Sequence, residues 1–386
     1  MRQGISEREY LSRLSRVRRR MKEREMDFLV VFSSYPEREG HIEYLTGYHS
    51  AFPPSQYDER YRGLGYSALL LSRTSRVVLF PCLLFASGTL VGVDKVMASE
   101  NLPLSVANSL SNLLNGNKRR IGLVGTDVIP SLYLEELKAK LSRNARQRFV
   151  VADSLLVGER MTKSSAELSI LRRGSKIADI GIEAAAAATK EGVRESEIAL
   201  AAMTACYNEG ADYVARTRIY GNKVSSVRWP IMTNRRLKGG EITGIDLVGW
   251  YEEYGFDVMR RWTVGSPNEE QRDLLGKAAA LTELTAKRIR PGMTGDEVCK
   301  ASVNAAAEIG IPRSSATPFG HAIGLEIVEE PILLPRATTP LRESAFVCIE
   351  PGVESESFGS VHIEDEVVIQ RDGSVEIVSK CPRVFV

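Results

Sequence analysis

The stretch over residues 242–264 constrains this chain more than any other feature. Two apolar runs flank a short polar turn at residues 252–255, a pattern typical of a β-hairpin. Folding the stretch about its centre places Asp246 opposite Asp257, ~4.5–5.5 Å apart on one face. Two carboxylates that close within apolar strands repel each other, and a cation between them removes that cost. Alternatively, one aspartate is buried in a satisfied network and the other is exposed.

A second hairpin pattern later in the chain carries two more carboxylates. It folds about residue 357 and places Glu350 opposite Glu364. Between the two hairpins lies His321, one of only four histidines in 386 residues. Four carboxylates and one imidazole suit two divalent ions of the Mn, Fe, Co or Zn kind better than a structural zinc. Two such ions balance the four charges and would acidify a bridging water into a nucleophile.

The set of five residues resembles the ligands of the pita-bread metallopeptidases, which include methionine aminopeptidase, aminopeptidase P and Xaa-Pro dipeptidase. The family's flanking motifs, such as Glu-Pro-Gly after the histidine, are also present. The matching residues are Asp246, Asp257, His321, Glu350 and Glu364. The resemblance implies that Asp246 and Glu364 bridge both ions, that Asp257 holds one of them, and that His321 and Glu350 hold the other. It also implies that Glu350 contacts the nucleophilic water.

The resemblance is strong over residues 159–386 and weaker over residues 1–158, which gives the expected domain boundary. Strand-like runs that alternate with helical patterns predict an α/β domain over residues 1–158. The Tyr-Leu-Thr-Gly segment at 44–47 resembles the N-terminal domain of creatinases and prolidases. Residues 159–386 are expected to form the α+β pita-bread catalytic domain.

An internal repeat predicts the symmetry of the catalytic domain. Residues 192–210 and 292–310 match at a constant offset, with glycines at both ends and Glu197 aligned with Glu297. A helix, a second helix and a hairpin therefore occur twice. We expect a pseudo-twofold domain with the metal site between its halves. A capping box at Ser164 predicts where the first helix begins.

Composition gives no global affinity for nucleic acid or membrane. The net charge is +2 and 43% of the residues are hydrophobic, yet no stretch approaches ~18 uninterrupted apolar residues. A basic helix face over residues 5–24 is better explained by solvation than by nucleic-acid binding. Five scattered cysteines without CxxC spacing, and no N-terminal apolar signal region, predict a cytoplasmic enzyme with reduced thiols.

Several positions depart from the pattern of the proline-specific members. Their accessory histidines are replaced by Trp229, Thr317 and Val328, and an arginine is replaced by His362. Trp229 would offer an aromatic face to an apolar group or an onium cation, or else belongs to the core. His362 lies two residues before Glu364, so on a strand both should face one side. It is a candidate acid/base or a residue that only orients Glu364.

An aromatic and polar segment at residues 52–66 is expected either as an exposed loop or as a loop over a substrate cleft. Tyr57 and Tyr61 are its candidate substrate-binding residues, alongside Trp229 and Val328. In the resembled family this domain reaches the active site of a partner subunit, which implies a homodimer.

We therefore expect a two-metal hydrolase of small C–N substrates, in the first place a peptidase acting on Xaa-Pro dipeptides or short peptides. Glu350 would manage the proton, with His362 as a candidate acid/base. The alternative is a metal lyase similar to dimethylsulfoniopropionate lyase, or a C–N hydrolase similar to creatinase or ectoine hydrolase. A third hypothesis, a non-catalytic binding protein, is weakened because all five ligands are present.

Overall fold

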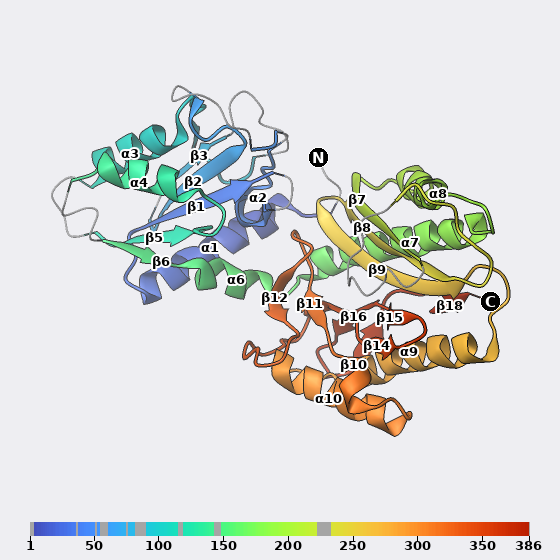
Figure 1. Ribbon diagram of the computed structural model, residues 1–386. Coiled ribbons are helices and arrows are strands. Elements are labelled where there is room, and N and C mark those ends of the chain that lie inside the picture. Colours follow the sequence, from blue (N-terminus) through green and yellow to red (C-terminus); the bar gives the residue numbers. More distant parts are fainter. Residues whose placement is uncertain are drawn as a thin grey trace. The chain divides into compact units, whose positions relative to one another are not determined.

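The computed structural model divides the chain into two compact units, residues 1–160 and 161–386 (Figure 1). Each unit has a hydrophobic core built from its own residues. No helix in the described part of the chain is long and apolar enough to cross a bilayer. The described residues are 4–35, 38–50, 52–54, 61–74, 76–81, 90–114, 119–142, 148–221 and 233–385.

The N-terminal unit is built around one mixed sheet with the strand order β4-β3-β2-β1-β5-β6. The central strand β1 pairs antiparallel with β2 and parallel with β5. Its strands are β1 (Phe28–Ser34), β2 (Tyr66–Ser72), β3 (Val77–Phe80), β4 (Lys95–Val96), β5 (Ile121–Val124) and β6 (Phe149–Val151). Its helices are α1 (Glu7–Glu23), α2 (Gly40–Thr46), α3 (Leu102–Leu113), α4 (Ser131–Ala139) and α6 (Asp153–Arg160).

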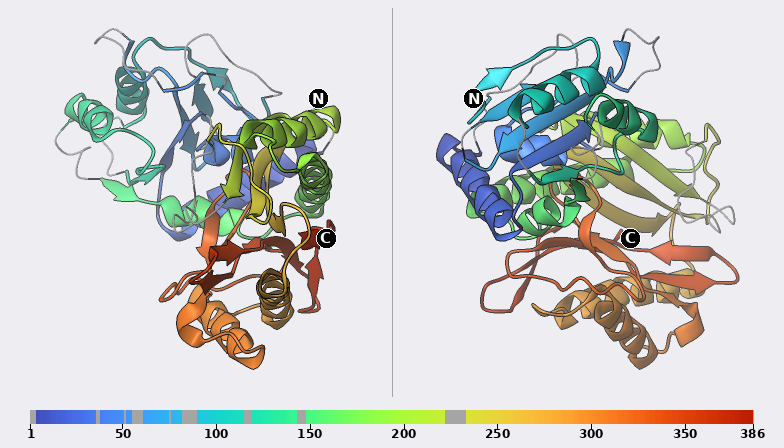
Figure 2. Two further views of the ribbon diagram at one scale, coloured as in Figure 1. Left: turned by 45° about the vertical axis from the view of Figure 1, so that its right-hand side comes forward. Right: turned by 90° about the vertical axis from the view of Figure 1, so that its left-hand side faces the viewer.

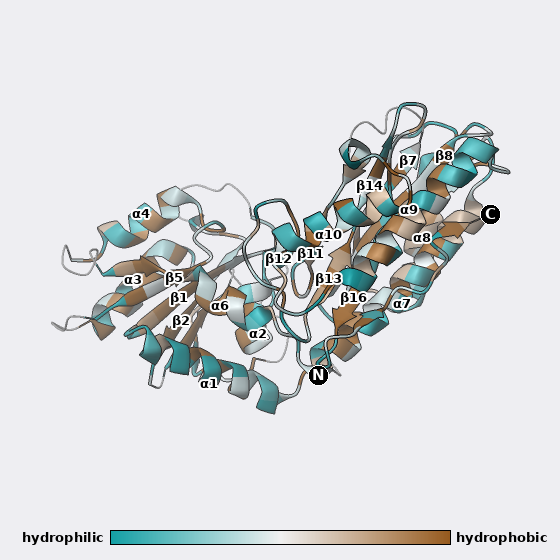
Figure 3. Ribbon diagram, turned by 90° about the horizontal axis from the view of Figure 1, so that it is seen from below, coloured by the Kyte–Doolittle hydropathy of each residue, from teal (hydrophilic) through white to brown (hydrophobic). Residues whose placement is uncertain are grey.

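Period-two and helical patterns in the sequence account for this arrangement. Alternate residues of β1 enter a core that also contains the apolar side of α3, including Val106 and Leu110. The stripe Leu14, Val17 and Met21 of α1 is buried, while the other face of that helix is hydrophilic (Figure 3). The α/β prediction for this part of the chain is confirmed.

A buried histidine gives the N-terminal unit an acid-sensitive contact. The Nδ1 atom of His41 lies 2.9 Å from Nη1 of Arg160, whose side chain is also buried. Burial, and next the charge of Arg160, lower the pKa of His41 from 6.5 to about 3. The imidazole is therefore neutral in the folded unit and accepts a hydrogen bond from the guanidinium.

We expect the free energy of unfolding of this unit to fall as the pH is lowered through 6.5. The unfolded chain then binds a proton at His41 that the folded unit excludes, so the stability present above pH 6.5 is lost below it. With these two pKa values, linkage gives a loss of about 2 kcal/mol at pH 5. Denaturant unfolding of wild type and His41→Gln between pH 7 and 5 measures this, because the amide keeps an acceptor but does not titrate. If the free energy of unfolding of wild type and of His41→Gln falls equally with pH, His41 is not the group responsible.

The C-terminal unit contains a four-stranded sheet, β18-β9-β8-β7, a five-stranded sheet, β12-β11-β13-β16-β17, and a three-stranded sheet, β10-β14-β15. The strands of the first half are β7 (Tyr213–Gly221), β8 (Ile242–Tyr251) and β9 (Tyr254–Thr263). Those of the second half are β10 (Ala316–Thr317), β11 (Gly320–Ala322), β12 (Glu329–Ile332), β13 (Phe346–Ile349), β14 (Gly352–Ser355), β15 (Gly359–His362), β16 (Asp365–Ile369), β17 (Val375–Ile377) and β18 (Val384–Phe385).

Two helix pairs pack on these sheets and confirm the predicted repeat. Helices α7 (Ser165–Ala188) and α8 (Glu195–Asn208) pack on β7–β9, whereas α9 (Glu269–Arg288) contacts β14 and β15 and is itself covered by α10 (Gly295–Glu308) (Figures 1 and 2). A 3-10 turn, η3 (Arg313–Ser315), follows α10. Helices α8 and α10 begin and end at positions 100 residues apart, since 295 − 195 and 308 − 208 both give 100.

Capping explains why the repeated helices begin and end where they do. The capping box of Ser164 with Glu167 opens α7 as predicted. Glycines Gly210 and Gly310 follow the two shorter helices with φ of 96° and 75°, a conformation that glycine adopts without strain. The repeat in the sequence is thus a repeat of helix ends as well as of helices.

The register of the first hairpin differs from the predicted one. Strands β8 and β9 are joined at Glu252 and Glu253, which have φ of 47° and 65°, the geometry of a two-residue primed turn. Asp246 therefore faces Met259, and Asp257 faces Val248. The predicted direct pairing of the two aspartates is wrong. They are diagonal neighbours on the same face, which still lets their carboxylates converge.

The second hairpin has the predicted register. The pairs Gly352–His362 and Ile349–Asp365 both centre on residue 357. Pairing is interrupted between β13 and β14 and between β15 and β16, and the two glutamates lie at these interruptions. The backbone N–H of Glu364 instead donates to Met259 O at 3.0 Å, which ties the second hairpin to the first.

Candidate metal centre

All five predicted ligands come together in one buried cluster. Every one of them is at most 6% exposed. The carboxylate oxygens of Asp246, Asp257 and Glu364 lie within 4.8 Å of one another. Nε2 of His321 lies 3.8 Å from Asp257 Oδ2 and 3.9 Å from Glu364 Oε1. Glu350 lines the same cavity.

Burial and mutual repulsion both disfavour the charged carboxylates of this cluster. Burial, followed by the charges of Asp246 and Glu350, raises the pKa of Asp257 well above its ordinary value. Burial, followed by the charge of Asp257, does the same to the pKa of Glu364. Within the described residues, no hydrogen-bond donor reaches Asp257 Oδ1 or Glu364 Oε1, although both atoms are buried. Buried carboxylate oxygens without donors need a cation, so these residues fit divalent ions.

The histidine is prepared to act as a neutral ligand. Nδ1 of His321 lies 3.1 Å from the carbonyl oxygen of Ala322, to which it donates, and this leaves the lone pair of Nε2 directed at the carboxylates. Burial lowers the pKa of His321 below 6.5, which keeps the ring unprotonated. Strand β11 fixes the backbone, because His321 is paired with Cys348 of β13.

A thiol lies beside the cluster. Cys348 Sγ is within 4.8 Å of ligand atoms of His321 and Glu364, and it donates to the backbone oxygen of Asp257 at 3.7 Å. Burial, followed by the charge of Glu364, raises the pKa of this thiol well above 9.0. Cys348 therefore packs beside the carboxylates as a small buried group that donates to the backbone.

The cluster forms the floor of a cavity of about 260 Å³. Apolar side chains form part of its wall, and Val328, a predicted pocket residue, is among them with 55% of its surface exposed. The remaining lining residues are Arg218, Val248, Phe319 and Ile327. The sequence analysis did not single out these four. Val248 could have been found from the period of strand β8, because it lies two residues after Asp246 and on the same face.

His362 does not line this cavity, whereas Glu364 does. Its ring packs where Gly352 has no side chain, with Nε2 2.7 Å from Ser360 Oγ. Its Nδ1 lies 3.8 Å from Glu350 Oε1 and 3.3 Å from the backbone oxygen of Glu350. The expectation that His362 and Glu364 share one side is therefore corrected, and the carboxylate that His362 approaches is that of Glu350.

Two of the remaining predicted substrate residues lie outside the described residues, and a third belongs to the N-terminal unit. Trp229 and Tyr57 lie outside the described residues. Tyr61 is half-buried in a turn of the N-terminal unit. Thr317, which takes the place of a family histidine, lies on β10.

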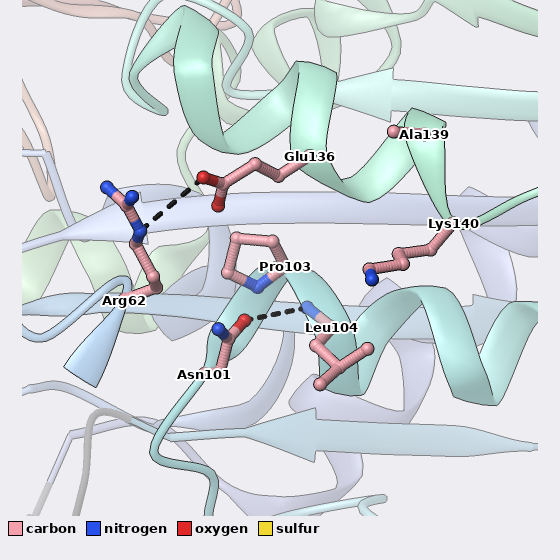
Figure 4. Close-up of a pocket in the computed structure, with 7 residues that line it drawn as sticks. All are labelled: Arg62, Asn101, Pro103, Leu104, Glu136, Ala139 and Lys140. Carbon is pink, nitrogen blue, oxygen red and sulfur yellow. Dashed lines mark hydrogen bonds and ion pairs between the residues drawn. The ribbon is translucent and has the colours of Figure 1, made fainter. Parts of the chain in front are cut away.

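A second hollow, in the N-terminal unit, has a structural explanation (Figure 4). Arg62 Nε lies 3.4 Å from Glu136 Oε1, and Asn101 Oδ1 accepts from Leu104 N–H at 3.0 Å as the N-cap of α3. Glu136 is the single acid among its described lining residues, so they offer no metal-binding set. The Asn101 contact caps α3, and the Arg62 pair joins the segment before β2 to α4.

The fold and the acidic cluster together define a metal-dependent hydrolase of the pita-bread type, preceded by a creatinase-like domain. Residues 169–371 match the metallopeptidase family M24, and residues 13–162 match the creatinase/prolidase N-terminal domain. The chain belongs to metallopeptidase family M24.

Named relatives and solved structures agree with this assignment. The chain is 31% identical to an Xaa-Pro dipeptidase of Pyrococcus horikoshii over 64% of its own length and 70% of the relative, and 30% identical to one of Pyrococcus furiosus over 67% and 73%. In fold it is similar to the prolidase from P. horikoshii (TM-score 0.78, 24% identity, 96% and 99% covered). It is also similar to an Xaa-Pro dipeptidase from Bacillus anthracis (TM-score 0.81, 21% identity, 97% and 100% covered).

Proposed function

We propose that this protein is a two-metal peptidase that cleaves Xaa-Pro dipeptides or similarly short peptides in an atypical pocket. The observation that carries the proposal is the convergence of four buried carboxylates on one neutral imidazole. The relatives named Xaa-Pro dipeptidase support the substrate class. Manganese as the native metal, a homodimer and a cytoplasmic location remain predictions from the sequence.

The distances support one division of the ligands between two ions. Asp257 and Glu364 would be shared by both ions. Asp246 would complete the site of one ion, and His321 and Glu350 would complete the site of the other. His321 lies beside both Asp257 and Glu364, which favours Asp257 over Asp246 as the second shared ligand. The resemblance to the family had given that role to Asp246.

When bound, such ions lower the pKa of a water molecule and polarise the scissile carbonyl. Glu350 would accept the proton of the attacking water and deliver it to the leaving nitrogen. Phe319, Ile327 and Val328 would receive the apolar part of the substrate. Trp229, Tyr57 and Tyr61 stay as predicted substrate contacts.

A substrate panel tests the proposal. Protein loaded with Mn²⁺, Co²⁺, Fe²⁺ or Zn²⁺ is incubated with Xaa-Pro dipeptides, longer Xaa-Pro peptides, creatine and dimethylsulfoniopropionate. We expect release of proline from the dipeptides, and none after treatment with a chelator. Release of dimethyl sulfide alone would instead assign the lyase chemistry, and inactivity with every compound would favour a binding protein.

The position of His362 predicts that it orients Glu350 rather than contacting substrate. Replacing it with alanine is expected to lower kcat by about 10- to 100-fold, as for residues that support metal ligands. His362→Asn should restore much of the rate, because its amide nitrogen can occupy the place of Nδ1 beside Glu350. Steady-state kinetics with a dipeptide and metal analysis of both variants measure this. Equal loss in both variants would argue against an orienting hydrogen bond.

A further inference from the structure

We propose that Arg218 binds the terminal carboxylate of the substrate and thereby selects dipeptides over longer peptides. The inference deepens the proposed peptidase function and rests on it. Arg218 lies on β7 directly opposite Asp246 and lines the cavity. Its Nη1 donates to Asp246 Oδ2 at 3.2 Å, and its side chain is 25% exposed.

The charge balance of the cavity leaves Arg218 available for an anion. Four carboxylates line the cavity, and two divalent ions would balance them. Among the described lining residues Arg218 is the single cationic side chain, since a histidine that ligates a metal ion is a neutral imidazole. Arg218 would therefore keep its positive charge when the carboxylates are balanced by metal ions. A carboxylate of the substrate can pair with this charge, whereas a neutral amide cannot.

The geometry of the guanidinium suits a carboxylate. The group carries five N–H donors in a planar fork, and the contact with Asp246 uses only Nη1. The donors that remain can bind both oxygens of a carboxylate, which is the strongest form of this pair. Asp246 also fixes the side chain, so little conformational freedom is lost on binding.

The position of Arg218 matches the reach of a dipeptide. Arg218 contacts a proposed metal ligand, so its fork lies one side chain away from the reacting centre. In a dipeptide, only the amide nitrogen and one Cα separate the scissile carbonyl carbon from the terminal carboxylate. A longer peptide places a neutral amide there, which cannot balance the charge.

A second described arginine side chain on this face of the sheet is engaged elsewhere. Arg261 lies on β9 opposite Gly244, two residues from Asp246 along β8, and is 1% exposed. Its guanidinium carbon lies 4.4 Å from the centre of the Tyr220 ring, a cation–π contact. Arg261 is not among the residues that line the cavity. Of these two arginines, Arg218 is therefore the one that a substrate in the cavity can reach.

The test compares the dipeptide Ala-Pro with its C-terminal amide. We expect wild type to have a lower KM for the acid than for the amide. Arg218→Gln should raise KM for the acid by about 10- to 100-fold, which is the range of a charge-assisted hydrogen bond. It should have a smaller effect on kcat and on KM for the amide. Arg218→Lys should lie between, because it keeps the charge and loses the fork. Arg172→Gln, which breaks a surface pair with Glu376, is the matched control.

Two further measurements separate this role from others. Metal analysis of Arg218→Gln shows whether the substitution acts through Asp246, and lost metal with equal damage to acid and amide would overturn the proposal. Calorimetric titration with N-acetyl-L-proline and its amide reports recognition without turnover. If wild type cleaves no peptide, the peptidase function fails. Binding of N-acetyl-L-proline and of its amide then still tests whether Arg218 binds a carboxylate. Tighter binding of the acid that disappears in Arg218→Gln supports it, whereas equal binding of acid and amide overturns it.

Discussion

Replacement of Asp257 by asparagine is expected to abolish hydrolysis and, at the same time, to stabilise the metal-free protein. Asp257 is close to Asp246, Glu364 and His321, so its replacement should weaken the binding of both ions. An amide carries no charge with which to hold them. The rate should fall by about 10³-fold or more, because metal activation supplies several kcal/mol of transition-state stabilisation.

The same substitution is expected to increase the stability of the metal-free protein because of the neighbours of Asp257. Burial and the charges around it raise its pKa, so ionised Asp257 destabilises the fold when no ion is present. Asparagine removes that charge, and its N–H₂ group can donate to the acceptors that surround it. We expect a gain of about 1–3 kcal/mol in the free energy of unfolding of metal-free protein. In the presence of metal the order should reverse, because wild type alone gains binding energy.

Asp365 provides the matched control, since its side chain is also fully buried in the C-terminal unit. Its two oxygens accept from Arg260 at 2.8 Å and from Arg383 at 2.7 Å. Asp365→Asn would leave the fully buried Arg260 without its counter-charge, while Arg383 would keep Glu283 at 3.1 Å, and the substitution should cost about 3–5 kcal/mol. Chemical denaturation of chelated protein compares the two variants. Destabilisation of metal-free protein by both substitutions would show that the charge of Asp257 does not destabilise the fold.

The sequence predicted the chemistry of the site more fully than its detailed geometry. Acidic residues on paired apolar strands are rare enough to identify, and the four carboxylates and the histidine converge as expected. The first hairpin was misjudged because Gly255 appeared to belong to the turn. Two glutamates adopt positive φ there instead, while Gly255 avoids a clash with Ile327. The resulting shift is two residues, an even number, so Asp246 and Asp257 stay on one face.

Long-range pairing explains what the sequence did not predict. Arg218 became a cavity residue because β7 pairs with β8 in a register that no local pattern encodes. His362 was assigned by strand period, but the ladder is interrupted just after it, where β15 ends. A period holds only while the strand continues. Glu350 and Glu364 lie at such interruptions, which is where sequence reasoning from regular elements is weakest.

Glu350→Gln is expected to retain the ions and lose turnover. The amide oxygen of glutamine can still ligate a metal, but it cannot accept the proton of the attacking water. We expect kcat for a dipeptide to fall by about 10²- to 10⁴-fold, with a smaller change in KM, as for loss of a general base. Metal analysis and steady-state kinetics of the same preparation measure both quantities. A rate restored by excess Mn²⁺ would instead assign Glu350 to ligation alone.

The double variant Glu350→Gln/His362→Ala separates a shared role from two independent ones. His362 approaches the carboxylate of Glu350 at 3.8 Å and does not line the cavity. If it acts through Glu350, removing it from the Glu350→Gln protein should cost little more, and the two effects will be strongly non-additive. Full additivity of the two losses in kcat would mean that His362 acts on the reaction by a route that bypasses Glu350.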